Sequence, residues 1–363
     1  MSTNIKQPIY DPAKTYDDNF DIGPFGDFKE PKPYKNEGEP AYTFLGYPIY
    51  SPFGIPAGPL LNSKYVIAAL KKGFDVVCYK TQRNLKFDCN AFPNVLYVNV
   101  DGDLTLEKAQ QPLIGKQQTS ADPTHITITN SFGNPSRGPK FWVDDLSKAI
   151  KQQNKGQLII MSVVGTIQPN FSNDDYYNDF AAVAKLAAET GVGAIEINLS
   201  CPNVANEGIL CYTPKAVTEI CRKVKEAVGN VPLIAKIGYY SNNQQELLEI
   251  VVKEMIPYVN AIAAINTITA PVVDENGNQA LPGPNRLKSG MCGTSIKWAG
   301  LDMVKRLDAL RKKLDLKFEI IGVGGVMNPE DFKEYQAAGA DVVQSATGAM
   351  WNPELGIQIK SKL

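Results

Sequence analysis

Hydrophobic and polar positions alternate along most of the chain in a way that predicts repeated strand and helix units. From Tyr47 onward, short apolar runs are followed by longer segments in which apolar residues recur every three or four positions. The short runs predict strands at residues 51–57, 76–80, 125–130, 158–164, 194–198, 233–237, 261–266, 319–322 and 342–346. The periodic segments predict helices at residues 180–190, 216–228, 244–256, 301–314 and 329–338.

The order of these elements predicts an α/β fold with a parallel sheet. Strands that are almost purely apolar indicate a sheet covered by helices on its faces. The natural closed form at this strand number is a (β/α)8 TIM barrel. Nine candidate strands for eight places leave one outside the barrel, and we expect it to be 51–57. A doubly wound open sheet is the alternative, but the glycine fingerprint GxGxxG is missing after the first strand.

Residues 1–45 differ from the rest and predict a proline- and aromatic-rich N-terminal arm. They combine prolines with aromatic residues set among charges, and they show no helical or strand period. We expect this arm to wrap the main domain or a partner subunit. The predicted division is therefore an arm at 1–45 and a barrel domain at 46–363.

Composition and charge narrow the class of ligand. The chain has 363 residues, 44% of them apolar, and a net charge of -1. Without a long run of Lys or Arg it shows no electrostatic footprint for nucleic acid or an anionic membrane, which favours a small-molecule ligand. There is no apolar run near the roughly 18 residues of a membrane span and no signal pattern. We expect a soluble, cytoplasmic protein.

The six cysteines and the single histidine limit the available chemistry. The cysteines lack CxxC spacing and His125 is the one histidine, so neither a metal ion nor an iron–sulfur cluster is predicted. The lone histidine also leaves acid–base chemistry to another group.

The carboxyl ends of the strands meet at one face of a barrel, so the residues at those ends are read as one candidate site. Two strands end in glycines, at Gly324 with Gly325 and at Thr347 with Gly348, where the following helix begins. Glycines there expose backbone N–H groups, and together with the glycine-rich segment around Gly293 they favour a phosphate site. Tight turns alone are the structural alternative.

The remaining strand ends are rich in amides and lysines. Four asparagines (Asn130, Asn198, Asn203 and Asn266) offer donors and acceptors suited to a planar ring that alternates C=O and N–H, such as a pyrimidine or an isoalloxazine. Lys80 and Lys236 end apolar strands, which favours an anion or a developing negative charge beside them, unless both reach solvent. Cys201 lies between Asn198 and Asn203, although a cysteine alone is more often a small buried hydrophobe.

Taken in order, these motifs resemble the dihydroorotate dehydrogenase family, class 1 soluble type with a cysteine base, over roughly residues 47–352. The matching pieces are PFGIPAG (52–58), YKT (79–81), NSFG (130–133), NLSCPN (198–203), AKI (235–237), INT (265–267), GVGG (322–325) and ATG (346–348).

The resemblance implies a flavoenzyme with FMN that oxidises dihydroorotate to orotate in pyrimidine biosynthesis. It implies that Cys201 is the catalytic base and that Lys80 and Lys236 assist catalysis and contact the flavin. The implied substrate contacts are Asn130, Phe132, Gly133, Asn198, Asn203, Asn266 and Thr267. The other implied cofactor contacts are Ala57, Gly58, Ser162, Gly293, Gly324, Gly325, Thr347 and Gly348, with Asn198 shared.

Two other functions stay open at this point. The pyrimidine-reducing domain of dihydropyrimidine dehydrogenases resembles this barrel and uses a cysteine, but those proteins carry CxxC segments that are missing here. A non-catalytic flavin-binding scaffold is the alternative from another class. The resemblance also implies a homodimer, while the electron acceptor (fumarate, NAD through a partner subunit, or a quinone) is not encoded in a readable motif.

Overall fold

A closed barrel of parallel strands forms the centre of the protein. The computed structural model describes residues 7–119, 122–200 and 210–363. Within these residues, eight strands pair in the closed order β10-β11-β12-β13-β16-β17-β3-β4. They are β3 (Phe53–Ile55), β4 (Val76–Gln82), β10 (Leu158–Val163), β11 (Ala194–Asn198), β12 (Leu233–Ile237), β13 (Ala261–Ala264), β16 (Glu319–Val323) and β17 (Val342–Gln344). The (β/α)8 prediction is confirmed.

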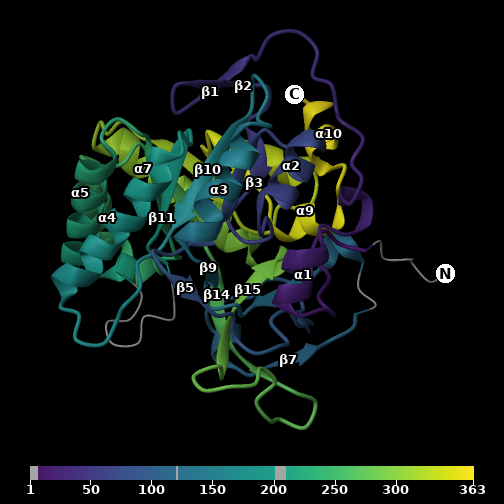
Figure 1. Ribbon diagram of the computed structural model, residues 1–363. Helices are drawn as coiled ribbons and strands as arrows, with labels where there is room; N and C mark the ends of the chain where they lie inside the picture. The colour runs from purple at the N-terminus through teal and green to yellow at the C-terminus, as the bar shows by residue number, and fades with distance from the viewer. Residues whose placement is uncertain (1–6, 120–121, 201–209) are drawn as a thin grey trace.

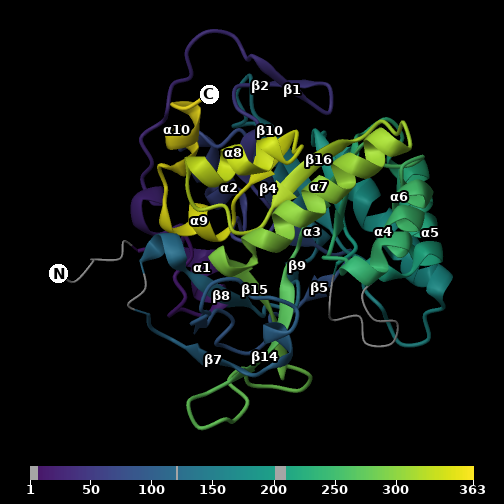
Figure 2. The ribbon, with the colours of Figure 1, turned by 180° about the vertical axis from the view of Figure 1, so that it is seen from behind.

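Helices cover the outside of the barrel, as Figures 1 and 2 show from opposite sides. They are α2 (Ser63–Lys71), α3 (Pro139–Ile150), α4 (Asn173–Glu189), α5 (Pro214–Val228), α6 (Gln245–Met255), α7 (Lys297–Lys313), α8 (Pro329–Ala337), α9 (Thr347–Trp351) and α10 (Leu355–Lys360). The sequence specifies their ends. Pro214 starts α5 and Gly229 follows its last residue with a φ of 62°, a conformation that favours glycine.

The strand predicted to lie outside the barrel was the wrong one. The run 51–57 supplies β3, which pairs with β17 and β4 inside the barrel. The run 125–130 instead supplies β8 (Thr127–Asn130), which pairs antiparallel with β15 (Lys288–Gly293) in a second sheet. The physical reason is visible in β8, where threonine alternates with isoleucine. Thr127, Ile128 and Thr129 are all buried, but the two polar side chains distinguish β8 from the nearly pure apolar strands of a parallel barrel.

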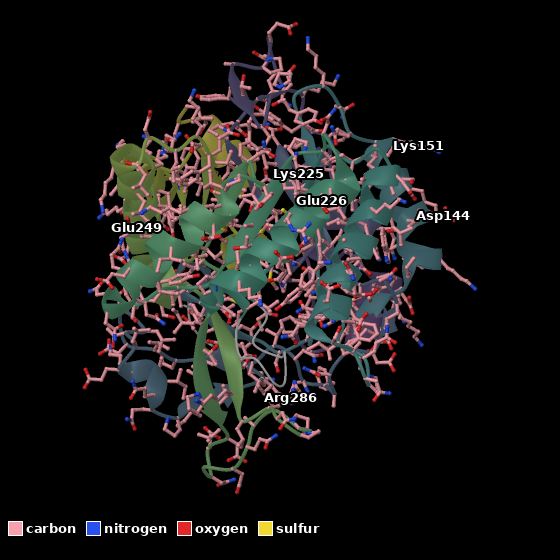
Figure 3. The ribbon with its side chains drawn as sticks, turned by 90° about the vertical axis from the view of Figure 1, so that its left-hand side faces the viewer. Asp144, Lys151, Lys225, Glu226, Glu249 and Arg286 are labelled. Carbon is pink, nitrogen blue, oxygen red and sulfur yellow. The ribbon has the colours of Figure 1, made fainter. Side chains whose placement is uncertain are left out.

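The second sheet lies at the carboxyl ends of the barrel strands. Its strands follow the order β14-β15-β8-β6-β7 and include β6 (Tyr97–Val98), β7 (Leu113–Lys116) and β14 (Ile268–Val273). Figure 1 shows β14 and β15 projecting from that end of the barrel, and Figure 3 shows Arg286 near their loop. A short ladder of β5 (Lys86–Phe87) and β9 (Ser136–Arg137) lies beside it. The glycine-rich segment 289–294 thus forms most of strand β15.

A hairpin covers the amino-terminal end of the barrel. Strands β1 (Tyr42–Phe44) and β2 (Tyr47–Ile49) pair antiparallel, and Phe44 and Ile49 are buried in one cluster with barrel residues such as Val76 and Leu158. Burial of large apolar side chains of this kind stabilises a fold by roughly 1.5–3 kcal/mol each. The predicted division between residues 45 and 46 falls inside this hairpin, and it stays a prediction.

The arm runs along the barrel from one end to the other, as the purple chain in Figure 1 shows. Its helix α1 (Tyr16–Ile22) is capped by Thr15, whose side chain accepts from the Asp18 N–H. The body holds this helix through its last carbonyls, because Asn62 Nδ2 donates to the Phe20 carbonyl and the Tyr65 hydroxyl donates to the Asn19 carbonyl. The arm therefore packs on its own barrel through specific contacts.

Candidate active site

A cavity opens at the carboxyl ends of the barrel strands, where the sequence predicts the site. Its empty volume is about 630 Å³, and its walls come from the barrel, the second sheet, the arm and α9. The lining residues are Tyr10, Pro56, Ala57, Gly58, Pro59, Val95, Ile128, Thr129, Asn130, Phe132, Lys236, Asn266, Thr267, Cys292, Val323, Ala346, Thr347 and Met350. A mostly apolar cavity with a few convergent polar groups is the usual form of a small-molecule site.

Two buried lysines approach this cavity from the ends of β4 and β12. Lys80 and Lys236 are each 4% exposed, so neither extends into solvent. Lys80 Nζ donates to the Gly58 carbonyl at 3.4 Å and lies 5.0 Å from the centroid of the Phe132 ring. Burial lowers the pKa of Lys80 to about 8, and the nearby Cys89 thiol opposes that shift. The structural alternative of solvent-reaching lysines is therefore wrong.

The amide groups form a connected set. Asn266 Nδ2 donates to Asn198 Oδ1 at 3.3 Å and approaches the Ser200 carbonyl at 3.4 Å. The Ser200 N–H donates to the same Asn198 oxygen at 3.2 Å. Asn198 pairs in register with Lys236 on the neighbouring strand. Preset amides beside a buried ammonium can orient a polar planar ligand.

A polar chain continues inward from the barrel mouth. Ser162 Oγ lies 2.9 Å from Thr81 Oγ1 and 3.0 Å from Glu196 Oε1, to which it donates. Glu196 is 1% exposed, and its other oxygen, Oε2, has no hydrogen-bond partner within the described part of the chain. A buried carboxylate oxygen without a donor is costly, so it marks a place where a ligand or water can supply an N–H or O–H.

Two glycine-bearing loops form the other end of the site. Gly324 and Gly325 follow β16 with φ values of 131° and 68°, and Thr347 and Gly348 open α9, where helix geometry leaves N–H groups without intrahelical partners. A Cβ on Gly348 would meet the Val326 carbonyl at 2.3 Å. The Ser345 hydroxyl also donates to that carbonyl, at 2.6 Å. The two loops therefore pack directly on each other.

Most of the predicted site residues come together. Ala57, Gly58, Asn130, Phe132, Lys236, Asn266, Thr267 and Thr347 line the cavity itself. Lys80 and Asn198 contact lining residues, whereas Ser162 lies deeper. The predicted glycines lie next to lining residues or in the adjoining loops; they are Gly133, Gly293, Gly324, Gly325 and Gly348. The predicted base Cys201 and the predicted ligand Asn203 lie outside the described residues.

Several residues in or near the cavity were not predicted from the sequence. Tyr10 lies in an arm whose aromatic residues gave no indication of which surface they cover. Glu196 had a signal, because it is a carboxylate in an otherwise apolar strand between Ile195 and Ile197. Cys292 lines the cavity, but burial raises the pKa of its thiol to about 12, against a smaller opposing effect of Lys236. A thiol with that pKa supplies little thiolate at neutral pH.

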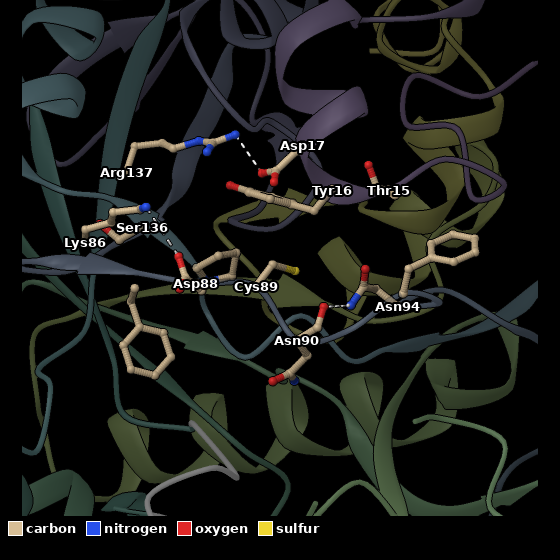
Figure 4. A pocket seen from close by; sticks show the side chains of 13 residues that line it. Thr15, Tyr16, Asp17, Lys86, Asp88, Cys89, Asn90, Asn94, Ser136 and Arg137 are labelled. Carbon is tan, nitrogen blue, oxygen red and sulfur yellow. Dashed lines mark hydrogen bonds and ion pairs between the residues drawn. The ribbon is translucent and has the colours of Figure 1, made fainter. Parts of the chain in front are cut away.

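A second cavity, drawn in Figure 4, lies between the arm and the segment 86–94. Its empty volume is about 740 Å³. Its charged side chains pair with one another, since Arg137 lies 2.7 Å from Asp17 and Lys86 lies 3.6 Å from Asp88. Tyr16 lines this cavity and also contacts Phe132, with 6.1 Å between the ring centroids. Tyr16 and Phe132 thus lie between the two cavities.

The fold and the site define a (β/α)8-barrel protein with its polar groups gathered at the carboxyl ends of the strands. Residues 110–363 match the family model for dihydroorotate dehydrogenase. The chain therefore belongs to the dihydroorotate dehydrogenase family, as the motifs predicted, and members of this family are oxidoreductases acting on CH–CH bonds.

Three relatives illustrate the similarity. The chain is 36% identical to dihydroorotate dehydrogenase of Dictyostelium discoideum over 99% of this chain and 98% of that one. It is 30% identical to dihydroorotate dehydrogenase B (NAD(+)), catalytic subunit, of Caldicellulosiruptor bescii over 71% of this chain and 77% of that one. It is also 30% identical to the same subunit of Methanocaldococcus jannaschii, over 63% of this chain and 70% of that one. Among the helices that the structure describes, none combines the length and apolar character needed to cross a membrane.

Proposed function

We propose that this protein oxidises dihydroorotate to orotate with bound FMN, in de novo pyrimidine biosynthesis. The observation that carries the proposal is a cavity beside two glycine loops that is lined by Lys236 and Asn266, while the buried Lys80 and Asn198 contact its lining residues. This arrangement suits a flat, polar, anionic ring on one side and a phosphate on the other.

The residues present fit FMN. Gly58 lines the cavity, and a Cβ added to it would meet nothing within 4 Å, so open space rather than protein lies above this glycine. The close approach of Gly348 to the Val326 carbonyl brings the two glycine loops together at one end. Gly324, Gly325, Thr347 and Gly348 would hold the phosphate, with Gly293 nearby. Ala57, Gly58 and Ser162 would lie against the ring system.

The chain's own groups would do the following work. FMN, when bound, supplies the acceptor for the hydride. Lys236 offsets negative charge that develops beside it, and its burial strengthens that effect. Asn130, Asn198, Asn203 and Asn266 hold the polar edge of the substrate, with Phe132, Gly133 and Thr267 around it. Lys80 attracts the substrate's negative charge, at a pH where its amine is protonated.

Cys201 would act as the base that removes a proton from a ring carbon of the substrate. The family motif NLSCPN supports this role, as does the raised pKa of Cys292, which makes the thiol that lines the cavity a poor base. In this reading Cys201 holds the proton at Sγ after the transfer.

Anaerobic mixing of the yellow holoprotein with dihydropyrimidines tests the proposal. Dihydroorotate should bleach the flavin, because its carboxylate meets Lys80 and the amides, while dihydrouracil lacks that group. Bleaching by dihydrouracil alone would favour the dihydropyrimidine alternative. A bound flavin that neither compound bleaches would favour a non-catalytic flavin-binding scaffold.

The proposal also includes a cytoplasmic homodimer, on the resemblance to class 1 enzymes. The acceptor of the electrons is to be identified by steady-state assays of the single chain with fumarate, NAD and a quinone.

A further inference from the structure

The N-terminal arm contributes one wall of the cavity. Tyr10 lines it together with Gly58, Phe132 and Met350, although Tyr10 lies far from these residues in sequence. The Tyr10 side chain is 2% exposed, so it is fully packed into the wall. The arm is therefore in direct contact with the residues proposed to bind substrate and cofactor.

Tyr10 contacts Phe132 in an edge-on geometry. The two ring centroids are 5.4 Å apart and the ring planes meet at 90°, a favourable arrangement for an aromatic pair. Phe132 in turn lies 5.0 Å from the Lys80 ammonium. Since a cation is attracted to the face of an aromatic ring, Phe132 both covers and holds this lysine.

Backbone hydrogen bonds fix this part of the arm. The Ile9 N–H donates to the Met350 carbonyl at 3.0 Å, and the Phe25 N–H donates to the Ile9 carbonyl at the same distance. The Asp11 N–H donates to Asn19 Oδ1 at 2.7 Å. Tyr10 is thus held between two anchored neighbours, Ile9 and Asp11. Ile9 is hydrogen-bonded to α9, the helix that Thr347 and Gly348 open.

We propose that Tyr10 is a positioning residue that holds Phe132 over the Lys80 ammonium, and that the arm is thereby part of the active site. The link to substrate binding rests on the proposed function, but the link to Lys80 does not. The ring of Tyr10 carries this role. Its hydroxyl has no hydrogen-bond partner among the described residues, so removal of the hydroxyl costs nothing that the structure shows.

Among the residues that the structure describes, the groups that face the Lys80 amine are the Gly58 carbonyl, the Phe132 ring and, at longer range, the Cys89 thiol. Loss of the Tyr10 ring frees Phe132 to move and lets water reach the amine. Water favours the charged form of an amine, so the pKa of Lys80 should then rise.

Competitive acetylation of lysines, followed by mass spectrometry over a range of pH, measures the pKa of Lys80 in flavin-free protein. Tyr10→Ala should raise it from about 8 toward the usual value of about 10.4, whereas Tyr10→Phe should leave it unchanged. Phe25→Ala is the matched control, since Phe25 is a buried aromatic of the arm that lies against Lys14. The Phe25→Ala variant should leave the pKa of Lys80 at its wild-type value.

A double-mutant cycle decides whether Tyr10 acts through Phe132. In a Phe132→Ala background, Tyr10→Ala should change Lys80 labelling no further. An equal change in both backgrounds, an unchanged Lys80 in Tyr10→Ala, or an equal effect of Phe25→Ala would each overturn the proposal.

Orotate binding to the FMN-loaded variants adds the second readout. Tyr10→Ala should weaken it about three- to tenfold, the range expected for one edge-on aromatic pair, and Tyr10→Phe should restore it. If wild-type protein fails to bind orotate, the proposed function is wrong. The acetylation of Lys80 still tests the role of Tyr10 in that case, because it does not depend on orotate. If wild-type protein binds orotate and Tyr10→Ala binds it equally well, the arm is not part of the substrate site.

Discussion

Asn266 donates its side-chain amide to Asn198 Oδ1 at 3.3 Å, and this hydrogen bond reaches from the second residue after β13 to the end of β11 across the intervening strand β12. The end of β12 contributes Lys236, which is in register with Asn198. The bond therefore fixes two amides on either side of a buried ammonium before any ligand arrives. Such preorganisation lowers the entropic cost of binding.

The first prediction follows from this pair. Asn266→Ala and Asn198→Ala should each weaken orotate binding, and the double variant should lose less than the sum of the two. We expect a coupling of about 1 kcal/mol, the net contribution of one hydrogen bond. Isothermal calorimetry on the four FMN-loaded proteins measures it. Strict additivity would show that the two amides act independently.

The second prediction concerns the cofactor. The protein should be yellow and should release FMN rather than FAD on denaturation, because two glycine loops offer a monophosphate site. FMN at about 100 times its Kd should raise the unfolding free energy of the flavin-free protein by about 2.7 kcal/mol.

Gly348→Ala should lose most of this stabilisation, since its new Cβ would meet the Val326 carbonyl at 2.3 Å and push the two loops apart. A Gly102→Ala variant would not serve as the control, because Gly102 has a φ of 62°, which a residue with a side chain rarely adopts. Ala182→Gly, on the exterior helix α4, leaves the loops intact and serves instead. Stabilisation by FAD as large as that by FMN would contradict a monophosphate site.

The third prediction uses the lowered pKa of Lys80. Below about pH 8 the amine is protonated in both the folded and the unfolded ligand-free chain. Between about pH 8 and about 10.4 the unfolded chain binds the additional proton, so this lysine makes stability rise with pH. The unfolding free energy of wild type minus that of Lys80→Met should therefore increase by about 3 kcal/mol over that range. Urea unfolding of both proteins at several pH values measures the difference.

Subtraction of the Lys80→Met variant removes the contributions of the other titrating groups. If the difference in unfolding free energy between the two proteins does not change with pH, the Lys80 amine lies in a more hydrated environment than its burial indicates. Orotate affinity should show the opposite trend in the wild type and fall above about pH 8, as Lys80 loses its charge.

The barrel itself could be predicted because its strands are apolar on both faces and its helices carry a regular apolar stripe. In α5, for example, Val217, Ile220, Cys221 and Val224 are buried at helical spacing. The prediction that placed β3 outside the barrel was wrong because Pro52 and Pro56 flank a very short apolar run, a pattern that is typical of an edge strand. Pairing with β17 and β4 is decided by closure of the sheet, a tertiary effect that no local pattern contains.

The candidate site was predictable as far as it consists of strand ends. Lys80, Lys236 and Asn198 end strands that the apolar pattern marks, and parallel strands bring such ends together. Tyr10 was not predictable, since its place depends on how a non-periodic arm folds back on the barrel through bonds such as Ile9 N–H to Met350. Contacts between segments so distant in sequence leave no periodic signal.

The fourth prediction separates binding from catalysis at Lys236. Lys236→Ala should slow flavin reduction about a hundredfold, or about 3 kcal/mol, because a preorganised charge acts mainly when negative charge develops. Orotate binding should weaken much less. Stopped-flow reduction and orotate titration of the same protein measure the two effects. Lys253→Ala, on the exposed face of α6, controls for loss of a positive charge. Equal losses in rate and affinity would indicate a simple binding role.

The last prediction concerns Cys201, whose role rests on the family motif. If its thiolate is the base, the thiol must lose its proton first, so flavin reduction by dihydroorotate should rise with pH through the apparent pKa of that thiol. Cys201→Ser and Cys201→Ala should keep FMN and orotate but lose about two to four orders of magnitude in the reduction rate, with alanine the slower. The pH profile of the serine variant should shift to higher pH, because a hydroxyl ionises less readily than a thiol. Cys221→Ala, within α5, controls for loss of a thiol elsewhere. Near wild-type reduction in Cys201→Ala would remove this cysteine from the mechanism.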